Sequence, residues 1–118
     1  MNKPETNDAL NLKRISMVED YISLHYRDDL KLSELADVVS MTPTSLCHIF
    51  NRYHNKRISD IIVETRIHHA KEMLKSTNLK IRFVAYECGF NTLTNFNRLF
   101  KRLTGMTPTE YKNNTKYE

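Results

Sequence analysis

Two stretches of the chain decide its fold: residues 35–52, LADVVSMTPTSLCHIFNR, and residues 84–102, VAYECGFNTLTNFNRLFKR. The second stretch repeats the plan of the first, once Asn91 is skipped. The equivalent pairs are Ala36 and Ala85, Ser40 and Gly89, Leu46 and Phe96, Phe50 and Phe100, and Arg52 and Arg102. Each copy predicts a short apolar helix, a tight turn, and a longer amphipathic helix whose exposed face is polar and basic. This is the plan of a helix-turn-helix, whose second helix can enter the major groove of DNA.

Composition and charge narrow the class of protein. The 118 residues are 40% hydrophobic with only two Gly and three Pro, which favours a small helical domain over a sandwich or a disordered chain. The net charge of +4 is uneven, because residues 1–30 carry four Lys/Arg against six Asp/Glu, and residues 31–118 carry fourteen against eight. A basic body favours a polyanionic partner, although a solvated surface would carry the same charge.

The chain shows no sign of a disulfide framework, a membrane span or a signal peptide. Cys47 and Cys88 are too few for a framework, and no run of about eighteen apolar residues occurs. Residues 1–11 lack an apolar signal-peptide core. We therefore expect reduced thiols in a cytoplasmic, nucleoid-associated protein.

Helical spacing of apolar residues extends beyond the two repeats. Over residues 13–27 it involves Ile15, Val18, Ile22 and Leu24, and over residues 57–76 it gives a wide apolar face on one long helix. The expected fold is all-α, with two helix-turn-helix modules joined by this long connecting helix and about seven helices in total. The expected divisions are a flexible arm or linker remnant over 1–12, a first module over 13–56, the connecting helix over 57–76, a second module over 77–112 and a polar tail over 113–118.

Capping signals place the ends of several helices. Thr42 is a helix cap followed by Pro43 at the first helical position, and either Asn91 or Thr92 caps the helix that ends at Gly105. The buried face of that helix is expected to contain Phe96, Leu99, Phe100 and Leu103. Residues 107–110, TPTE, form a capping box that starts a short last helix.

The positions Ala85, Gly89-Phe90, Phe96, Phe100-Lys101, Gly105, Thr107-Pro108 and Tyr111 strongly resemble the DNA-binding domain of the AraC/XylS family of bacterial transcription regulators. The resemblance covers roughly residues 13–112, since Leu35-Ala36, Thr42-Pro43, Leu46 and Phe50 match the first module of that family. It departs from the family pattern at Ser40 and Asn55, where the family usually has Gly. The resemblance implies a sequence-specific, double-stranded DNA-binding regulator, in a family that leans toward activators that touch RNA polymerase.

Base contacts are expected from the polar faces of the two second helices. In the second module these positions are Leu93, Thr94, Asn97 and Arg98, and in the first they are Thr44, Cys47 and His48 beside Pro43. Arg98 can bind guanine in bidentate fashion and Asn97 can pair with adenine. The alternatives without a base contact are a solvated or phosphate-facing Arg98, a surface His48, and a Leu93 that lies in the core or at an interface. Because the first face is small and nearly neutral, we expect it to read bases less strongly.

Phosphate contacts are expected from basic residues at the ends of these helices: Arg52, Lys56 and Arg57 after the first, and Lys101 and Arg102 after the second. Arg66 could contact the DNA backbone or pair within the domain, and we favour the structural role. Two modules on a rigid spacer should enter successive major grooves, about one helical turn or ~34 Å apart.

Other classes of function find less support. No catalytic or metal-binding constellation occurs, since neighbours such as His68 and His69, or Cys47 and His48, point apart on a helix. We therefore expect neither an enzyme nor a cofactor. The remaining alternative is a helical protein-interaction or RNA-binding module. The isolated domain is expected to be a monomer, and either a stand-alone regulator or part of a larger one that dimerises through another domain.

Overall fold

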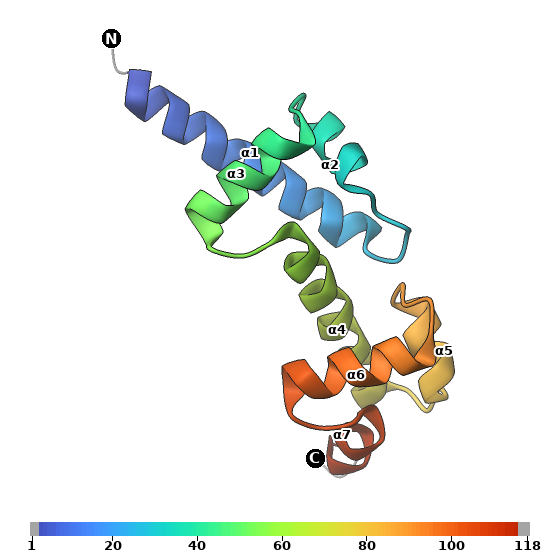
Figure 1. The fold of residues 1–118 in the computed structure, drawn as a ribbon. Coiled ribbons are helices and arrows are strands. Elements are labelled where there is room, and N and C mark those ends of the chain that lie inside the picture. Colours follow the sequence, from blue (N-terminus) through green and yellow to red (C-terminus); the bar gives the residue numbers. More distant parts are fainter. Residues whose placement is uncertain (1–2, 116–118) are drawn as a thin grey trace. The chain divides into compact units, whose positions relative to one another are not determined.

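The computed structural model describes residues 3–115, and side chains within residues 8–114. The described residues form seven helices and no strand, so the predicted all-α fold is confirmed (Figure 1). The helices are α1 (Lys3–His25), α2 (Leu32–Val38), α3 (Pro43–His54), α4 (Ile58–Ser76), α5 (Ile81–Glu87), α6 (Leu93–Thr104) and α7 (Pro108–Thr115).

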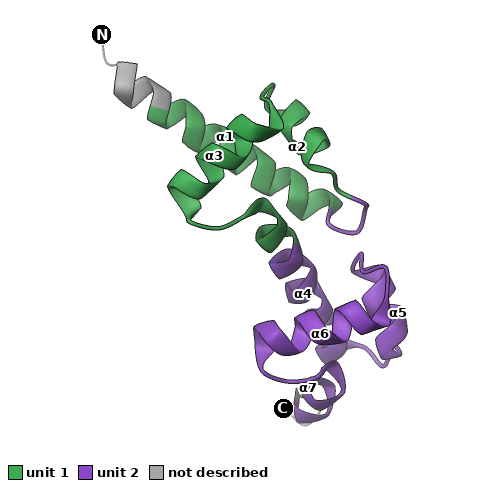
Figure 2. Cartoon of the chain, viewed as in Figure 1, with its two compact units in different colours: residues 1–25, 30–62 green, residues 26–29, 63–118 purple. Residues whose placement is uncertain are grey.

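The chain forms two compact units, which Figure 2 distinguishes by colour. Unit 1 contains residues 1–25 and 30–62, and unit 2 contains residues 26–29 and 63–118. The boundary lies inside α4, so the first turn of the predicted connecting helix belongs to unit 1 and the rest belongs to unit 2. Each unit contains one helix-turn-helix pair, α2–α3 in unit 1 and α5–α6 in unit 2.

Helix α1 begins at Lys3, earlier than the predicted start at residue 13. Pro4 is compatible with a first helical turn, and no further helix breaker stands before residue 13. The segment predicted as an arm is therefore helical from Lys3 onward. At the other end, α7 continues to Thr115, past the predicted end of the second module at residue 112. Residues 1–2 of the predicted arm and 116–118 of the predicted tail lie outside the described residues.

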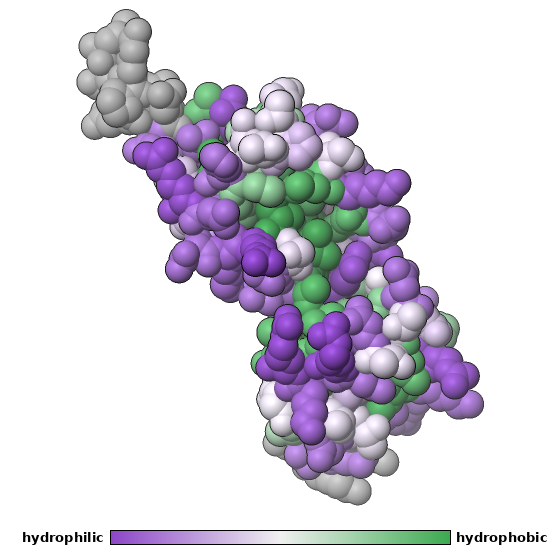
Figure 3. Space-filling view, viewed as in Figure 1, coloured by the Kyte–Doolittle hydropathy of each residue, from purple (hydrophilic) through white to green (hydrophobic). Residues whose placement is uncertain are grey.

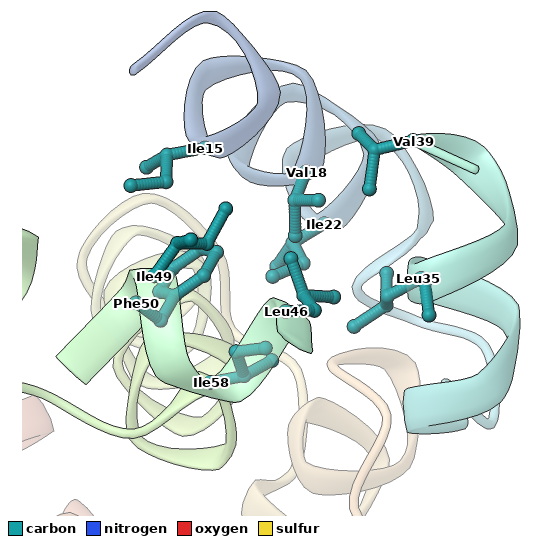
Figure 4. Packing of buried hydrophobic residues seen from close by; sticks show 10 residues of the cluster. Ile15, Val18, Ile22, Leu35, Val39, Leu46, Ile49, Phe50 and Ile58 are labelled. Atoms are coloured by element: carbon teal, nitrogen blue, oxygen red, sulfur yellow. The ribbon is translucent and has the colours of Figure 1, made fainter. Parts of the chain in front are cut away.

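The core of unit 1 joins α1, α2 and α3, whose side chains converge in Figure 4. Its fully buried members include Val18 and Ile22 from α1, Leu35 from α2, and Leu46 and Phe50 from α3. Leu24 was predicted to share this face and is instead 78% exposed. It follows Ile22 by two residues, which turns its side chain about 200° around the helix, away from the core.

The core of unit 2 is a cluster of aromatic side chains packed with aliphatic ones. Phe90, Phe96 and Phe100 contact one another in sequence, with ring centroids 5.0 and 5.5 Å apart, and Tyr111 of α7 closes the cluster against Phe100. Leu103 was predicted to join this face and is instead 41% exposed. It lies in the last turn of α6, where it lines a shallow pocket beside α4 rather than entering the core.

The two turns use the same backbone solution. Ser40 and Gly89 both have positive φ, at 56° and 99°. After each of them the next residue, Met41 or Phe90, donates its N–H to the carbonyl of the equivalent Ala36 or Ala85, at 3.0 Å in both cases. The sequence repeat is therefore a repeat of structure.

Candidate nucleic-acid interface

Helix α3 begins at the cap that the sequence indicated. The Thr42 hydroxyl accepts a hydrogen bond from the Ser45 N–H at 3.1 Å, and Pro43 occupies the first helical turn. Asn55 ends the helix in the left-handed conformation. Because Leu46, Ile49 and Phe50 point into the core, the opposite face is presented to solvent. Thr44 and His48 are exposed on that face.

Helix α6 has the same construction with a stronger amphipathic pattern. Thr92, rather than Asn91, is the cap, since its hydroxyl accepts from the Asn95 N–H at 3.1 Å. Gly105 ends the helix with a φ of 83°. Thr94, Asn97 and Arg98 are exposed, as expected of base-reading residues.

Asn95 is a member of this surface that the sequence analysis did not single out. Its side-chain oxygen accepts a hydrogen bond from Nη2 of Arg98 at 2.7 Å. Residues three apart on a helix are neighbours, so this spacing was the available signal. The contact restricts the conformations of the Arg98 side chain, so less side-chain entropy would be lost if this guanidinium bound a ligand.

Two predicted base contacts are less exposed than the rest. Leu93 is half-buried and packs against the core of unit 2, because it is the first residue of α6 and lies beside the aromatic cluster. Cys47 is also half-buried, and it lines an apolar pocket with Phe50. These two side chains therefore present only part of their surface, in contrast to Thr44, His48, Thr94, Asn97 and Arg98.

The five predicted phosphate contacts are all exposed: Arg52, Lys56 and Arg57 in unit 1, and Lys101 and Arg102 in unit 2. They lie in or just after the last turns of α3 and α6. Long cationic side chains in these places can reach a polyanion without disturbing the core.

Arg66 has the structural role that we favoured. Its guanidinium donates to the carbonyl oxygens of Tyr26 and Asp28, each at 2.8 Å. Burial lowers the pKa of this guanidinium, partly offset by Asp29. The segment 26–29 is further held by the Arg27–Glu87 ion pair and by Tyr26, whose ring stacks on His69 at 3.9 Å. Arg66 is thus committed to contacts within unit 2.

Two observations concern thiol reactivity and metal binding among the described side chains. Burial raises the pKa of the Cys88 thiol to about 11, so the thiol is inert as a nucleophile at neutral pH. No group of three or more His, Cys, Asp or Glu among these side chains could hold a metal ion. Of the helices that the structure describes, none is long and apolar enough to cross a membrane.

Comparison with known proteins identifies the family. A family model described as a helix-turn-helix domain matches residues 35–114. A transcriptional regulator from Chromobacterium violaceum with an AraC-type DNA-binding domain has a solved structure with a TM-score of 0.84. That match covers 88% of this chain and 93% of that one at 19% identity. The chain belongs to the AraC/XylS family of transcription regulators. It is a DNA-binding domain of the kind found in transcription regulators, and the family is not a family of enzymes.

Relatives of this AraC-type domain are longer proteins. An uncharacterized HTH-type transcriptional regulator of Staphylococcus aureus (strain MSSA476) is 36% identical over 103 residues, which are 87% of this chain and 14% of that protein. The uncharacterized regulator YijO of Escherichia coli K12 is 34% identical over 95 residues, covering 80% of this chain and 34% of YijO. The chain thus spans a minor part of each of these relatives.

A further solved structure supports the AraC-type fold. The DNA-binding domain of AdpA, in complex with a target DNA, has a TM-score of 0.81 at 19% identity, covering 86% of this chain and 92% of that one.

Proposed function

We propose that this AraC-type domain reads double-stranded DNA with two recognition helices, α3 and α6, each placed in a major groove. The observation that carries the proposal is the division of each helix into two faces. On α6 the side chains of Phe96, Leu99 and Phe100 are buried, whereas Thr94 and Arg98 are exposed on the opposite side. A capped, rigid helix with a free polar face is the element that enters a groove in helix-turn-helix proteins.

In this proposal α6 reads more sequence than α3. Arg98 and Asn97 carry the two side chains best suited to bidentate contacts, with guanine and adenine respectively. The matching positions on α3 are His48 and the half-buried Cys47, which offer fewer hydrogen bonds. Thr44 and Thr94 can contact a thymine methyl or a base edge, and Leu93 offers only its exposed edge.

The five exposed cations at the ends of α3 and α6 hold phosphates and fix the register of each helix. Such contacts are independent of sequence and weaken as salt increases. One copy of the domain would then recognise an asymmetric site with two short motifs about ten base pairs apart, one helical turn of DNA. The solved structure of the AdpA DNA-binding domain in complex with a target DNA, which has a similar fold, supports the proposal.

Regulation of transcription in the whole protein, by activation through contact with RNA polymerase, is the further part of this proposal. This part of the proposal rests on membership of the AraC/XylS family. We propose that the isolated domain binds as a monomer.

The experiment is a competition between nucleic acids. A labelled duplex bound by the purified domain is challenged with unlabelled duplex DNA and with single-stranded RNA, compared at equal concentrations of phosphate. The proposal expects the duplex to displace the label at much lower concentration. If RNA competed better, the alternative of an RNA-binding module would replace the proposed one.

A further inference from the structure

Helix α1 carries a stripe of exposed apolar side chains outside the face that enters the core. Leu10, Met17 and Leu24 follow one another at intervals of seven residues, and Leu10 and Met17 are 43% and 42% exposed. Seven residues make almost two full turns, with a drift of about 20°, so the three side chains lie along one line. We call these three residues the α1 stripe. Figure 3 shows hydrophobic side chains at the surface of unit 1, bordered by hydrophilic residues.

The spacing of the α1 stripe is that of a surface for a second helix. Single exposed leucines are common on proteins and indicate nothing. Apolar residues at an interval of seven, in contrast, form the seam along which two helices pack. Leu12 is also exposed, but it lies about 140° around the helix from Met17 and does not share this line.

Two charged residues beside the stripe indicate what the second helix is. Lys13 and Asp20 are both exposed and lie on the same side of the stripe, within about 60° of Met17 around the helix. They are about 10.5 Å apart along the helix axis, too far to pair within one copy. Neither has an ion-pair partner among the side chains that the structure describes. The same side of α1 therefore offers one cation and one anion, each available to another molecule.

We propose that two copies of this chain associate through α1, with the two helices antiparallel around a two-fold axis at Met17. Leu10 then lies opposite the partner's Leu24, and the two Met17 side chains meet. An antiparallel pair brings like sides of the two helices together. Lys13 therefore lies within about one residue of the partner's Asp20 along the axis, and the symmetry forms this ion pair twice.

The charges oppose a parallel pair of α1 helices. A parallel pair brings unlike sides of the helices together, so Lys13 would lie beside the partner's Arg14. Arg14 is half-buried on the other side of the stripe, where its Nη1 donates to Oδ1 of Asn11 at 3.2 Å. Two cations would then meet twice in each dimer. Flanking charges set the orientation of paired helices in this way.

The size of the α1 stripe limits the strength of the contact. Three apolar side chains from each copy bury less than the roughly 1,200–2,000 Å² of a stable interface. We therefore expect a dissociation constant on the order of 100 µM to 1 mM. The domain is then a monomer at the low concentrations of DNA-binding measurements, in agreement with the proposed function. No proposed DNA contact lies on α1, so the association does not rest on that function.

Sedimentation equilibrium of the purified chain, from about 20 µM to 1 mM, measures the association. The wild type should dimerise within this range. Met17→Lys should weaken the dimer at least tenfold, because two like charges would meet at the two-fold axis. Leu12→Lys is the matched control, since it places the same charge on an exposed leucine outside the stripe, and it should leave the association unchanged. Circular dichroism confirms that each variant is folded.

Charge reversal at low ionic strength tests the antiparallel pairing. Lys13→Glu should weaken the dimer about tenfold, since it replaces two attractive pairs by two repulsive ones. Asp20→Lys should have the same effect. The double variant Lys13→Glu/Asp20→Lys should restore the association, because the reversed charges face each other between copies. In a parallel pair, Lys13→Glu would instead strengthen the dimer by facing the partner's Arg14.

Cross-linking reports the orientation directly. Leu10→Cys and Leu24→Cys chains, both with Cys47→Ser, are mixed and treated with a short bis-maleimide; the remaining Cys88 is buried. The antiparallel pair predicts cross-links between one chain of each kind. Four results would overturn the proposal: a monomer up to the highest concentration, equal effects of Met17→Lys and Leu12→Lys, no recovery in the double variant, or cross-links only between identical chains.

Discussion

Ser40 and Gly89 occupy the same position in the two helix-turn-helix turns, and both have a positive φ. Their surroundings differ. A Cβ added at Gly89 would lie 2.6 Å from the carbonyl oxygen of Tyr26 and 2.8 Å from Nε of Arg66. The turn in unit 2 therefore needs glycine for space as well as for conformation, whereas the turn in unit 1 accommodates the Ser40 side chain at an exposed position.

This difference predicts the effect of substitution in the two turns. Gly89→Ala should lower the free energy of unfolding by about 2–4 kcal/mol, because it combines backbone strain with a clash against backbone and a hydrogen-bonded guanidinium. Gly105→Ala is the matched control, since φ there is also positive but nothing lies within 4 Å of the added Cβ. It should cost only about 1 kcal/mol. Urea unfolding measures both, and equal losses would show that the contacts around Gly89 contribute nothing.

Ser40→Gly should stabilise the domain by up to about 1 kcal/mol. Glycine adopts a positive φ without the steric penalty that serine carries there, although it raises the entropy of the unfolded chain. The measurement is the midpoint of urea unfolding. A clear loss of stability would mean that the serine side chain makes a compensating interaction.

Arg66→Ala should destabilise the domain without changing which DNA sequences it prefers. The substitution removes two hydrogen bonds to the carbonyls of Tyr26 and Asp28, which we expect to cost about 1–3 kcal/mol. Arg82→Ala, on the exposed face of α5, is the control for loss of positive charge. Thermal unfolding and duplex binding are measured for both. A change in base preference with Arg66→Ala would place that arginine at the DNA instead.

Arg98, Asn95 and Lys101 should give three different binding phenotypes. Arg98→Ala should lose about 1–3 kcal/mol of discrimination at one base position. Asn95→Ala should produce a smaller loss at that same position, because Asn95 only orients the Arg98 fork. Lys101→Ala should weaken binding to all duplexes and reduce the salt slope by about one. Competition titrations at several salt concentrations separate the three, and identical profiles would contradict the division of roles.

Glu110 in α7 makes the stability of the domain depend on pH. The backbone N–H of Thr107 donates to its carboxylate at 2.9 Å, and this bond, followed by the Thr107 side chain, lowers the pKa of Glu110. Since the folded pKa lies below the unfolded value of about 4.3, the stabilisation is complete above that pH. It disappears as pH falls through the folded pKa. The measurement is the melting temperature as a function of pH. Glu110→Gln should make the decrease in melting temperature at acid pH smaller, and an unchanged decrease would contradict the role of Glu110.

The helix-turn-helix elements were predictable because local signals agreed there. Thr42 with Pro43, Asn55 and Gly105 each specify a helix end through backbone chemistry, and the buried faces follow a simple period. The repeat also continues into the next helix. The Asp60 carboxylate accepts from the Arg57 N–H as the Glu110 carboxylate accepts from the Thr107 N–H.

The incorrect predictions concern residues whose burial or helical state does not follow from the local sequence pattern. Leu24 follows Ile22 by two residues and lies on another side of α1, whereas Leu103 has the right spacing but lies in the last turn of α6, where it lines a pocket beside α4. The early start of α1 was missed because residues 3–12 are polar, and polarity alone does not prevent a helix. The spacing of Asn95 and Arg98 permits their contact, but its formation depends on rotamers, and the half-buried state of Leu93 depends on the neighbouring core.

The central claim, that two helices of one domain read DNA, is tested most directly by selecting bound duplexes from a random library at a stated moderate salt concentration. The account predicts an asymmetric motif in two parts about ten base pairs apart, with more information in the part under α6. Arg98→Ala should erase one base preference in that part and leave the other part intact. A single short motif, or salt-sensitive binding with no enriched sequence, would contradict reading by both helices.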